Sequence, residues 1–217
     1  MKRKKIIGIL TITSVLVVSV FIGGTLAFLV KQTNREANAF TFGNADIELT
    51  EEQWQKLTDE EKTVYPGKEV TKDPKVTNTG GTDIYVYLEV KIPRADVRTV
   101  SAGVDGTEEI DSTKVQNLFS YTPNGDWIEI ENTSDDEWNT IIYGYDKILK
   151  PGAETAVLFD SVEYLNIVEG ELKKDTRLNM PINAYAIQTG YLNESGSTNI
   201  EKMKDAFSKY NAEAERR

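Results

Sequence analysis

The chain has 217 residues, with 25 lysine and arginine residues against 35 aspartate and glutamate residues, a formal net charge of −10, and neither histidine nor cysteine. Without imidazole or thiolate side chains, the common zinc sites, the Ser-His-Asp triad and a cysteine nucleophile are excluded. The acidic balance argues against nucleic acid as a partner, because that binding depends on lysine and arginine neutralising phosphates. Cations with oxygen ligands, such as Ca²⁺, remain compatible with this composition.

The N-terminus has the layout of a secretory signal peptide over residues 1–27. Four basic residues at positions 2–5 precede an uncharged run at 6–24, and Thr25-Leu26-Ala27 follows. This basic, apolar and cleavable order predicts export, with cleavage between Ala27 and Phe28. The apolar run is also long enough to cross a bilayer as a helix, so a retained membrane anchor is the alternative.

Residues 28–38 are predicted to form an N-terminal extension that precedes a single domain at 39–217. The extension has an apolar tip followed by polar residues, and an extended segment of this kind can pair with an open sheet edge of a neighbouring subunit. A frayed terminus is the alternative. The candidate donor strand consists of Phe28, Leu29, Val30, Lys31, Gln32, Thr33, Asn34, Arg35, Glu36, Ala37 and Asn38.

Period-two alternation predicts that the domain is built from β-strands. Apolar residues occupy every second position at 83–92 and again at 177–188, where Pro181 indicates an edge or a bulge. Turn signals such as Pro66-Gly67 and Asn124-Gly125 separate the strands. Shorter strand-like runs lie at 39–49, 71–79, 127–131, 138–145 and 155–164. The polar stretch 94–113 has little periodicity and is predicted to be an inserted loop.

Two segments carry helix signals. Residues 50–53 form a capping-box pattern followed by Trp54 and Leu57 at helical spacing, and residues 198–201 repeat the pattern. The second pattern opens an apolar stripe of Ile200, Met203, Phe207 and Tyr210. Each stripe predicts a short helix packed on a sheet. The fold class is therefore all-β, a jelly-roll-like antiparallel two-sheet sandwich with a few short helices.

Candidate ligand-binding groups are few. One acidic cluster is Asp135-Asp136-Glu137, and a second comprises Asp105, Glu108, Glu109 and Asp111. Both have oxygen ligands that suit Ca²⁺ but neither has the EF-hand spacing, so we favour solvated loops and expect no resident cofactor. Trp54, Trp127 and Trp138 fit core or cross-strand positions better than a sugar-binding platform. No pair of carboxylates stands out as catalytic.

Several motifs, taken in order, resemble the TasA/camelysin family. The resemblance covers most of the chain outside 94–113 and rests on the signal ending at 23–28, the first strand at 42–49, Tyr65-Pro66-Gly67, the Val-x-Asn-x-Gly run at 76–80, Lys150-Pro151-Gly152 with Leu158-Phe159, and the strand at 184–188. It implies a jelly-roll subunit of extracellular fibres in the biofilm matrix or on the surface of Gram-positive bacteria. It also implies processing by a SipW-type signal peptidase, donor-strand exchange between copies and accessory matrix proteins as partners.

The leading functional prediction is a secreted, non-enzymatic fibre subunit that forms a homopolymer by β-strand donation. Some members of the resembled family are described as metalloproteases, but the H-E-x-x-H zinc site requires two histidines, which this sequence lacks. A secreted metal-dependent peptidase using carboxylates alone is the first alternative. A monomeric surface adhesion domain is the second.

Overall fold

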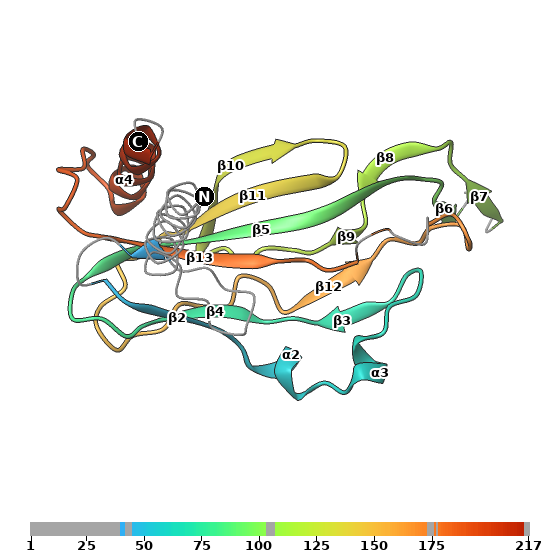
Figure 1. Ribbon diagram of the computed structural model, residues 1–217, viewed down its shortest axis with the longest axis horizontal. Coiled ribbons are helices and arrows are strands. Elements are labelled where there is room, and N and C mark those ends of the chain that lie inside the picture. Colours follow the sequence, from blue (N-terminus) through green and yellow to red (C-terminus); the bar gives the residue numbers. More distant parts are fainter. Residues whose placement is uncertain (1–39, 42–44, 103–106, 173–175, 177, 215–217) are drawn as a thin grey trace, which may run out of the picture.

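The computed structural model describes residues 40–41, 45–102, 107–172, 176 and 178–214. In this part of the chain the strands form two packed layers, with a helix outside one of them (Figure 1). The larger sheet has the order β1 (Phe40–Thr41), β13 (Ile182–Gln188), β5 (Ile84–Val97), β11 (Trp138–Tyr145) and β10 (Trp127–Ser134). Its strands pair antiparallel except β1, which runs parallel to β13.

The second layer lies beneath the larger sheet and consists of two small antiparallel sheets. One pairs β2 (Ile47–Glu51) with β4 (Pro74–Asn78), and the other has the order β3 (Glu69–Thr71), β12 (Ser161–Tyr164) and β9 (Phe119–Ser120). β8 (Lys114–Asn117) pairs with the far end of β5, while β6 (Val100–Ala102) and β7 (Glu108–Ile110) form a separate hairpin. The all-β prediction, with antiparallel sheets and few helices, is confirmed.

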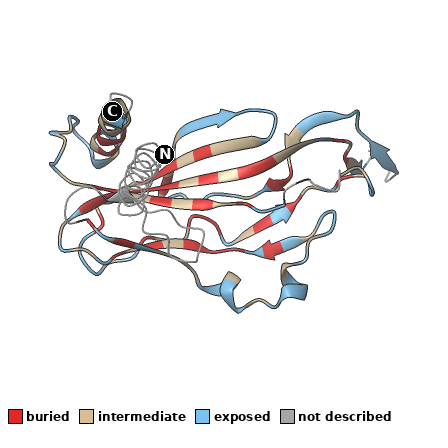
Figure 2. Cartoon of the chain, viewed as in Figure 1, coloured by how far each residue is buried: buried red, intermediate tan, exposed pale blue. Residues whose placement is uncertain are grey.

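The hydrophobic core lies between the two layers. The alternate residues Ile84, Val86, Leu88, Val90 and Ile92 point from β5 into this core and are at most 3% exposed. They pack with residues of the opposing layer, including Val76 from β4 and Val162 from β12. Figure 2 shows the buried residues concentrated along these strands. The period-two pattern at 83–92 therefore predicts both the strand and its buried face.

The opposite face of the larger sheet is covered by α4 (Asn199–Ala214). Met203 and Phe207 of the predicted stripe are buried against Tyr85 and Tyr87, while Ile200 and Tyr210 are partly buried there. The Tyr87 hydroxyl donates a hydrogen bond of 2.8 Å to the Met203 carbonyl oxygen. Burial raises the pKa of this hydroxyl, which keeps it protonated as a donor. The helix is thus held by both apolar packing and a buried hydrogen bond.

The capping prediction for α4 is confirmed. The amide of Glu201 donates to the Thr198 hydroxyl at 3.2 Å, and the Thr198 amide donates to the Glu201 carboxylate at 3.1 Å. Backbone donors at its first turn lower the pKa of Glu201, led by the amide of Ser197 and followed by that of Thr198. In the described part of the chain, no helix is both long and apolar enough to span a bilayer.

The capping box predicted at residues 50–53 is wrong. Thr50 belongs to β2, where it pairs with Lys75. The helix that follows, α2 (Glu52–Lys56), has no capping side chain at Glu51. Its amides are capped by Asp73 instead, whose carboxylate accepts from Gln53 N at 2.9 and 3.0 Å and from Trp54 N at 3.2 Å. The ladder between β2 and β4 thus takes precedence over the local helix signal.

The predicted packing of this helix on a sheet is also wrong, because α2 has no buried residue. Trp54 instead lies beneath two cations, with Lys72 Nζ 4.8 Å and Lys62 Nζ 5.2 Å from its ring centre. Lys62 ends α3 (Asp59–Lys62), a helix that was not predicted although Thr58 and Glu61 form a complete capping box at its start.

The loop predicted at 94–113 is also wrong in large part. β5 continues to Val97 because β8 pairs with residues 94–97, and the rest contains the strands of the β6–β7 hairpin. Four other strand predictions are correct in place but too long, and in the run at 71–79 only Thr71 and residues 74–78 are strand. The run at 39–49 divides into β1 and β2, the run at 155–164 is strand only from Ser161, and the run at 177–188 is strand only from Ile182. Pro181 precedes that strand and accepts a hydrogen bond from Lys91 N.

Replacing Gly144 with valine is expected to loosen α4 and destabilise the fold by about 2 kcal/mol, because overpacking a filled site has costs of this size. A Cβ atom at Gly144 would lie 2.0 Å from Met203 Sδ and 2.7 Å from Ile130 Cδ1. Urea denaturation of the variant provides the measurement. Gly81→Ala is the matched control, since a Cβ atom there meets nothing within 4 Å. Equal stability of the two variants would contradict the packing argument.

Candidate functional site

The outer edge of β13 is the most distinctive candidate site for pairing with another chain. Residues 183, 185 and 187 of β13 direct their main-chain groups toward β5, as the neighbouring bond from Lys91 N to Pro181 O indicates. The alternate residues Ile182, Ala184, Ala186 and Gln188 therefore direct theirs away from β5. Among the described residues, only the two residues of β1 pair with this outer edge. β1 thus covers the middle of this edge, at Tyr185 and Ala186, and no described strand pairs with its ends at Ile182 and Gln188.

The composition of β13 does nothing to protect that edge. Its sequence, Ile-Asn-Ala-Tyr-Ala-Ile-Gln, has no charged residue and no proline, and its register against β5 is unbroken. Natural sheets usually block an exposed edge with charges, proline or a bulge. An unprotected edge with buried alternate side chains can instead accept an added strand, because that strand gains both main-chain bonds and apolar contacts.

The opposite edge of the same sheet, β10, is protected. A β-bulge interrupts its pairing with β11 between Glu129 and Glu131, and both of these glutamates are exposed. The exposed residues Asn132, Thr133 and Ser134 complete a polar outer half of the strand. Charges and bulges both discourage edge-to-edge pairing. The two sides of the larger sheet therefore differ in kind, and the β13 side, where the outermost described strand β1 has only two residues, is the one suited to pairing.

β2 presents a second edge on the same side of the sandwich. Among the strands that the structure describes, β2 pairs with β4 alone, and its residues Ile47 and Leu49 direct their main-chain groups away from that partner. β2 also lies against β13 across the layers (Figure 1). The buried side chains Ile47, Ala184 and Ala186 belong to one core cluster. An extended segment on this side would therefore meet edges from both layers.

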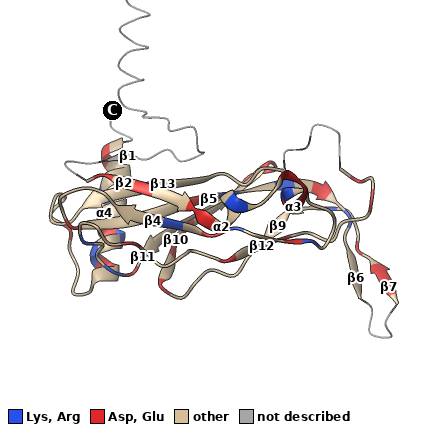
Figure 3. Cartoon of the chain, turned by 90° about the horizontal axis from the view of Figure 1, so that it is seen from below, with Lys and Arg blue, Asp and Glu red and all other residues tan. Residues whose placement is uncertain are grey.

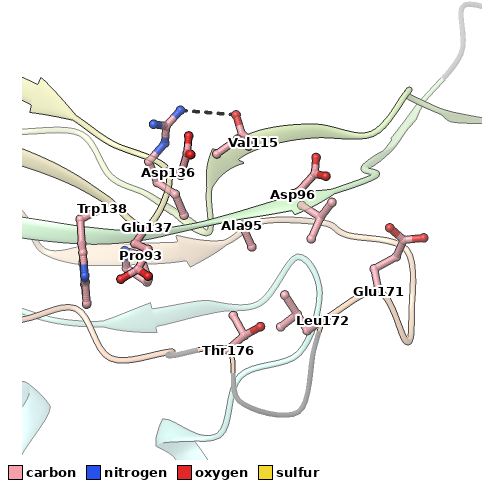
Figure 4. Close-up of a pocket in the computed structure, with 12 residues that line it drawn as sticks. Pro93, Ala95, Asp96, Val115, Asp136, Glu137, Trp138, Glu171, Leu172 and Thr176 are labelled. Atoms are coloured by element: carbon pink, nitrogen blue, oxygen red, sulfur yellow. Dashed lines mark hydrogen bonds between the residues drawn. The ribbon is translucent and has the colours of Figure 1, made fainter.

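A surface pocket of about 560 Å³ lies at the far end of β5 (Figure 4). Its walls include Trp138, Asp136 and Glu137 from the β10–β11 turn and Asp96 from β5. The Arg94 guanidinium in this wall is already hydrogen-bonded to the carbonyl oxygens of Asp135 and Val115. Its role is to tie β5, β8 and the turn together.

The predicted acidic clusters have structural partners. The Asp135 carboxylate accepts from the amides of Trp138 at 2.7 Å and Glu137 at 2.8 Å, and these bonds, in that order, lower the Asp135 pKa. Asp111 of the second cluster accepts from the Thr99 hydroxyl at 2.8 Å, whereas Glu108 and Glu109 are exposed. Asp105 lies outside the described residues. Where the structure describes the chain, no three acidic side chains are placed to hold a metal ion.

The three tryptophans do not form a common platform. Trp127 is buried and donates through Nε1 to the Ala156 carbonyl oxygen at 3.1 Å. Trp54 packs with lysines near α2, and Trp138 lies at the pocket. The prediction of core and cross-strand roles is confirmed for Trp127, whose ring packs 5.0 Å from that of Tyr145. A shared sugar-binding surface is not formed by these residues.

The predicted cleavage site, Ala27 and Phe28, and the candidate donor strand, Phe28 to Asn38, lie outside the described residues. The acceptor edge was not predicted, although the strand that forms it was. The available signal was compositional, since the segment 182–188 lacks charges while the segment 127–134 carries two glutamates. Strand order, which decides the edges, is a tertiary property.

Comparison with known proteins gives one match. A family model described as camelysin metallo-endopeptidase matches residues 1–134, which is more than half of the chain. No curated protein and no solved structure matches the chain. The matched region includes the N-terminal segment and every strand from β1 to β10.

Calcium is expected to leave the melting temperature unchanged, because Asp135 already accepts two amide hydrogen bonds and Asp111 accepts one from Thr99. Thermal melting during a calcium titration tests this. The Asp136→Asn variant is the matched control for the exposed turn carboxylate. A rise in melting temperature that chelator reverses, and that this variant lacks, would contradict the prediction and identify a calcium site at the β10–β11 turn.

Proposed function

We propose that this chain, which belongs to the camelysin metallo-endopeptidase family, is an exported structural subunit that polymerises by β-strand donation. Residues 28–38 of one copy would pair with the outer edge of β13 in the next copy. The observation that best supports this proposal is the contrast between the two sides of the larger sheet. The outer edge of β13 is uncharged and pairs, among the described residues, only with the two-residue β1, whereas the edge of β10 is bulged and acidic.

The chemistry of the donor segment matches this edge. Phe28, Leu29 and Val30 provide apolar side chains that an acceptor can bury, and no proline interrupts residues 28–38. Main-chain bonds supply affinity in such pairing, and side chains on alternate positions fix the register. A contact between unlike surfaces of identical copies does not close by itself, so repeated addition generates a filament.

Export and processing fit the same proposal. While the signal peptide is attached, the donor segment is tied to an apolar run of 19 residues at 6–24. Cleavage by a SipW-type signal peptidase between Ala27 and Phe28 would free the segment outside the cell. Other copies of the chain are the proposed main partners, together with accessory matrix proteins on the cell surface or in the extracellular matrix.

Proline in the donor segment is expected to prevent fibre growth, because proline has no amide hydrogen to donate to a ladder. The amides of successive strand residues point to opposite sides, so one of the two residues Thr33 and Asn34 faces the acceptor. Of the variants Thr33→Pro and Asn34→Pro, at least the one at that position must lose a hydrogen bond to the acceptor. Electron microscopy and sedimentation of the mature chain, residues 28–217, provide the readout. Thr33→Val and Asn34→Ala are the matched controls and should assemble.

Removing residues 28–38 should abolish assembly, and a synthetic peptide of that sequence should inhibit growth of the intact protein by occupying its acceptor edge. A scrambled peptide of the same composition should not inhibit. Fibres formed by the truncated chain would contradict strand donation as the mechanism.

The family description raises peptidase activity as the second candidate. Such an enzyme would have to activate water with a metal held by carboxylates, since the chain has no histidine or cysteine. We propose that the protein is not a peptidase, and expect the purified mature chain to leave casein intact with or without added divalent cations. Proteolysis that chelator abolishes, and that copurifies with the protein through successive columns, would overturn this proposal.

A further inference from the structure

The β6–β7 hairpin forms a projecting arm at one end of the molecule (Figure 3). Its strands follow directly on β5, whose 14 residues run the length of the sandwich, roughly 45 Å at the usual rise of a strand. All described residues of β7 are exposed, and no other named strand of the described chain pairs with the hairpin, although an isolated bridge joins Thr99 to Ile167 at its base. An isolated two-stranded ribbon is only marginally stable in water. The arm therefore requires fixed attachments at its base.

Those attachments are present. The Val100 amide donates to the Asn166 carbonyl oxygen at 2.8 Å, and the Asn166 side chain donates back to the Val100 carbonyl oxygen at 3.0 Å. The Thr99 hydroxyl donates to Asp111 at 2.8 Å. Arg98 forms hydrogen bonds to the Glu171 carboxylate at 2.6 and 2.8 Å. The β6 side of the base is thus tied to the sandwich, and the Thr99–Asp111 bond ties the β7 side to β6.

The free edge of β7 is available for contact. The bond from Asp111 N to Thr99 O makes those residues a hydrogen-bonded pair, so Ile110, opposite Val100, directs its main-chain groups away from β6. The Ile110 side chain is 58% exposed. Tyr65, 61% exposed, lies in the turn whose Gly67 amide donates to the Tyr164 carbonyl oxygen at 3.0 Å, two residues before Asn166. The two most exposed large apolar side chains described therefore lie at this end, which we call the hairpin pole.

The other end of the long axis carries different features (Figure 1). Here lie the turn that follows β13, with Tyr191 50% exposed, and the exposed Lys150, which follows the bridge between Leu149 and Ile84 at the start of β5. The first described strand, β1, also lies toward this end (Figure 3). We call this end the leader pole. Its exposed lysine is complementary in charge to the exposed Glu108 and Glu109 of the arm.

We propose that the hairpin pole of one copy docks on the leader pole of the next, with Ile110 packing against the Tyr191 turn. This inference rests on the proposed function, because a head-to-tail filament in which all copies share one orientation brings unlike poles together. Strand donation would provide the strong link, and the arm would set the orientation of successive subunits. The occupant of the arm is therefore a second copy of this chain.

Cysteine cross-linking tests this contact cleanly, because the natural chain has no cysteine. Mature chains carrying Ile110→Cys are mixed with chains carrying Tyr191→Cys, allowed to assemble and treated with a short bismaleimide. Heterodimers on a denaturing gel are expected. The matched control replaces Ile110→Cys with Thr133→Cys, an exposed position on the flanking strand β10, and should give none. In addition, Ile110→Asp should raise the critical concentration for fibre growth about tenfold.

The outcomes separate the two proposals. Fibres that form without the Ile110–Tyr191 cross-link, or that link equally through Thr133, would overturn the polar contact while strand donation stands. A cross-link that also forms between truncated chains lacking 28–38, without fibres, would support the polar contact and leave donation as the step that extends it. Fibres from the truncated chain, linked through Ile110 and Tyr191, would support the contact and overturn donation. Absence of both fibres and cross-links in every mixture would overturn both.

Discussion

Burial of both faces of β5 is the constraint on which the rest of the structure depends. Its even-numbered residues from Ile84 to Ile92 form the centre of the sandwich core, while Tyr85 and Tyr87 on the other face are at most 2% exposed beneath α4. Tyr87 is fixed there by its bond to the Met203 carbonyl oxygen and by a tilted ring contact with Phe207 at 5.1 Å. Because β5 also pairs with β13, β11 and β8, it fixes the position of every other strand in the larger sheet and of the arm beyond it.

Local sequence signals were sufficient where the deciding interactions are local. The alternation at 83–92 predicted a strand and its buried face, and the pair Thr198 and Glu201 predicted the start of α4. The signal at 50–53 failed because Thr50 and Glu51 pair with β4. The helix therefore begins at Glu52, and its amides are capped by the carboxylate of Asp73, 20 residues from Gln53 in sequence. The polar stretch 94–113 gave no alternation because both faces of the β6–β7 hairpin are largely exposed, so no buried side marks it as strand.

The candidate acceptor edge could be predicted only in part, for a related reason. Residues 182–188 are recognisable as a strand, but a strand becomes an edge only through the order in which others pair with it. The parallel pairing of β1 with β13 joins segments nearly 150 residues apart, and no local pattern specifies it. The sequence does show a difference in charge, because β10 contains two glutamates and β13 contains no charged residue. The bulge in β10 is visible only in the structure. Those differences become interpretable once the strand order is known.

Several carboxylates of the described region accept hydrogen bonds from main-chain amides at turns and helix ends. Asp73 caps the amides of α2, Asp135 accepts the amides of the β10–β11 turn, and Glu201 accepts those that begin α4. Glu171 and Asp111 brace the base of the arm through Arg98 and Thr99. Amides at helix starts and tight turns lack strand or helix partners, and a carboxylate satisfies them with strong, charge-assisted hydrogen bonds. In a protein without disulfides, whose proposed assembly depends on main-chain pairing, acidic side chains that fix turns and helix ends hold the edges in the geometry that pairing requires.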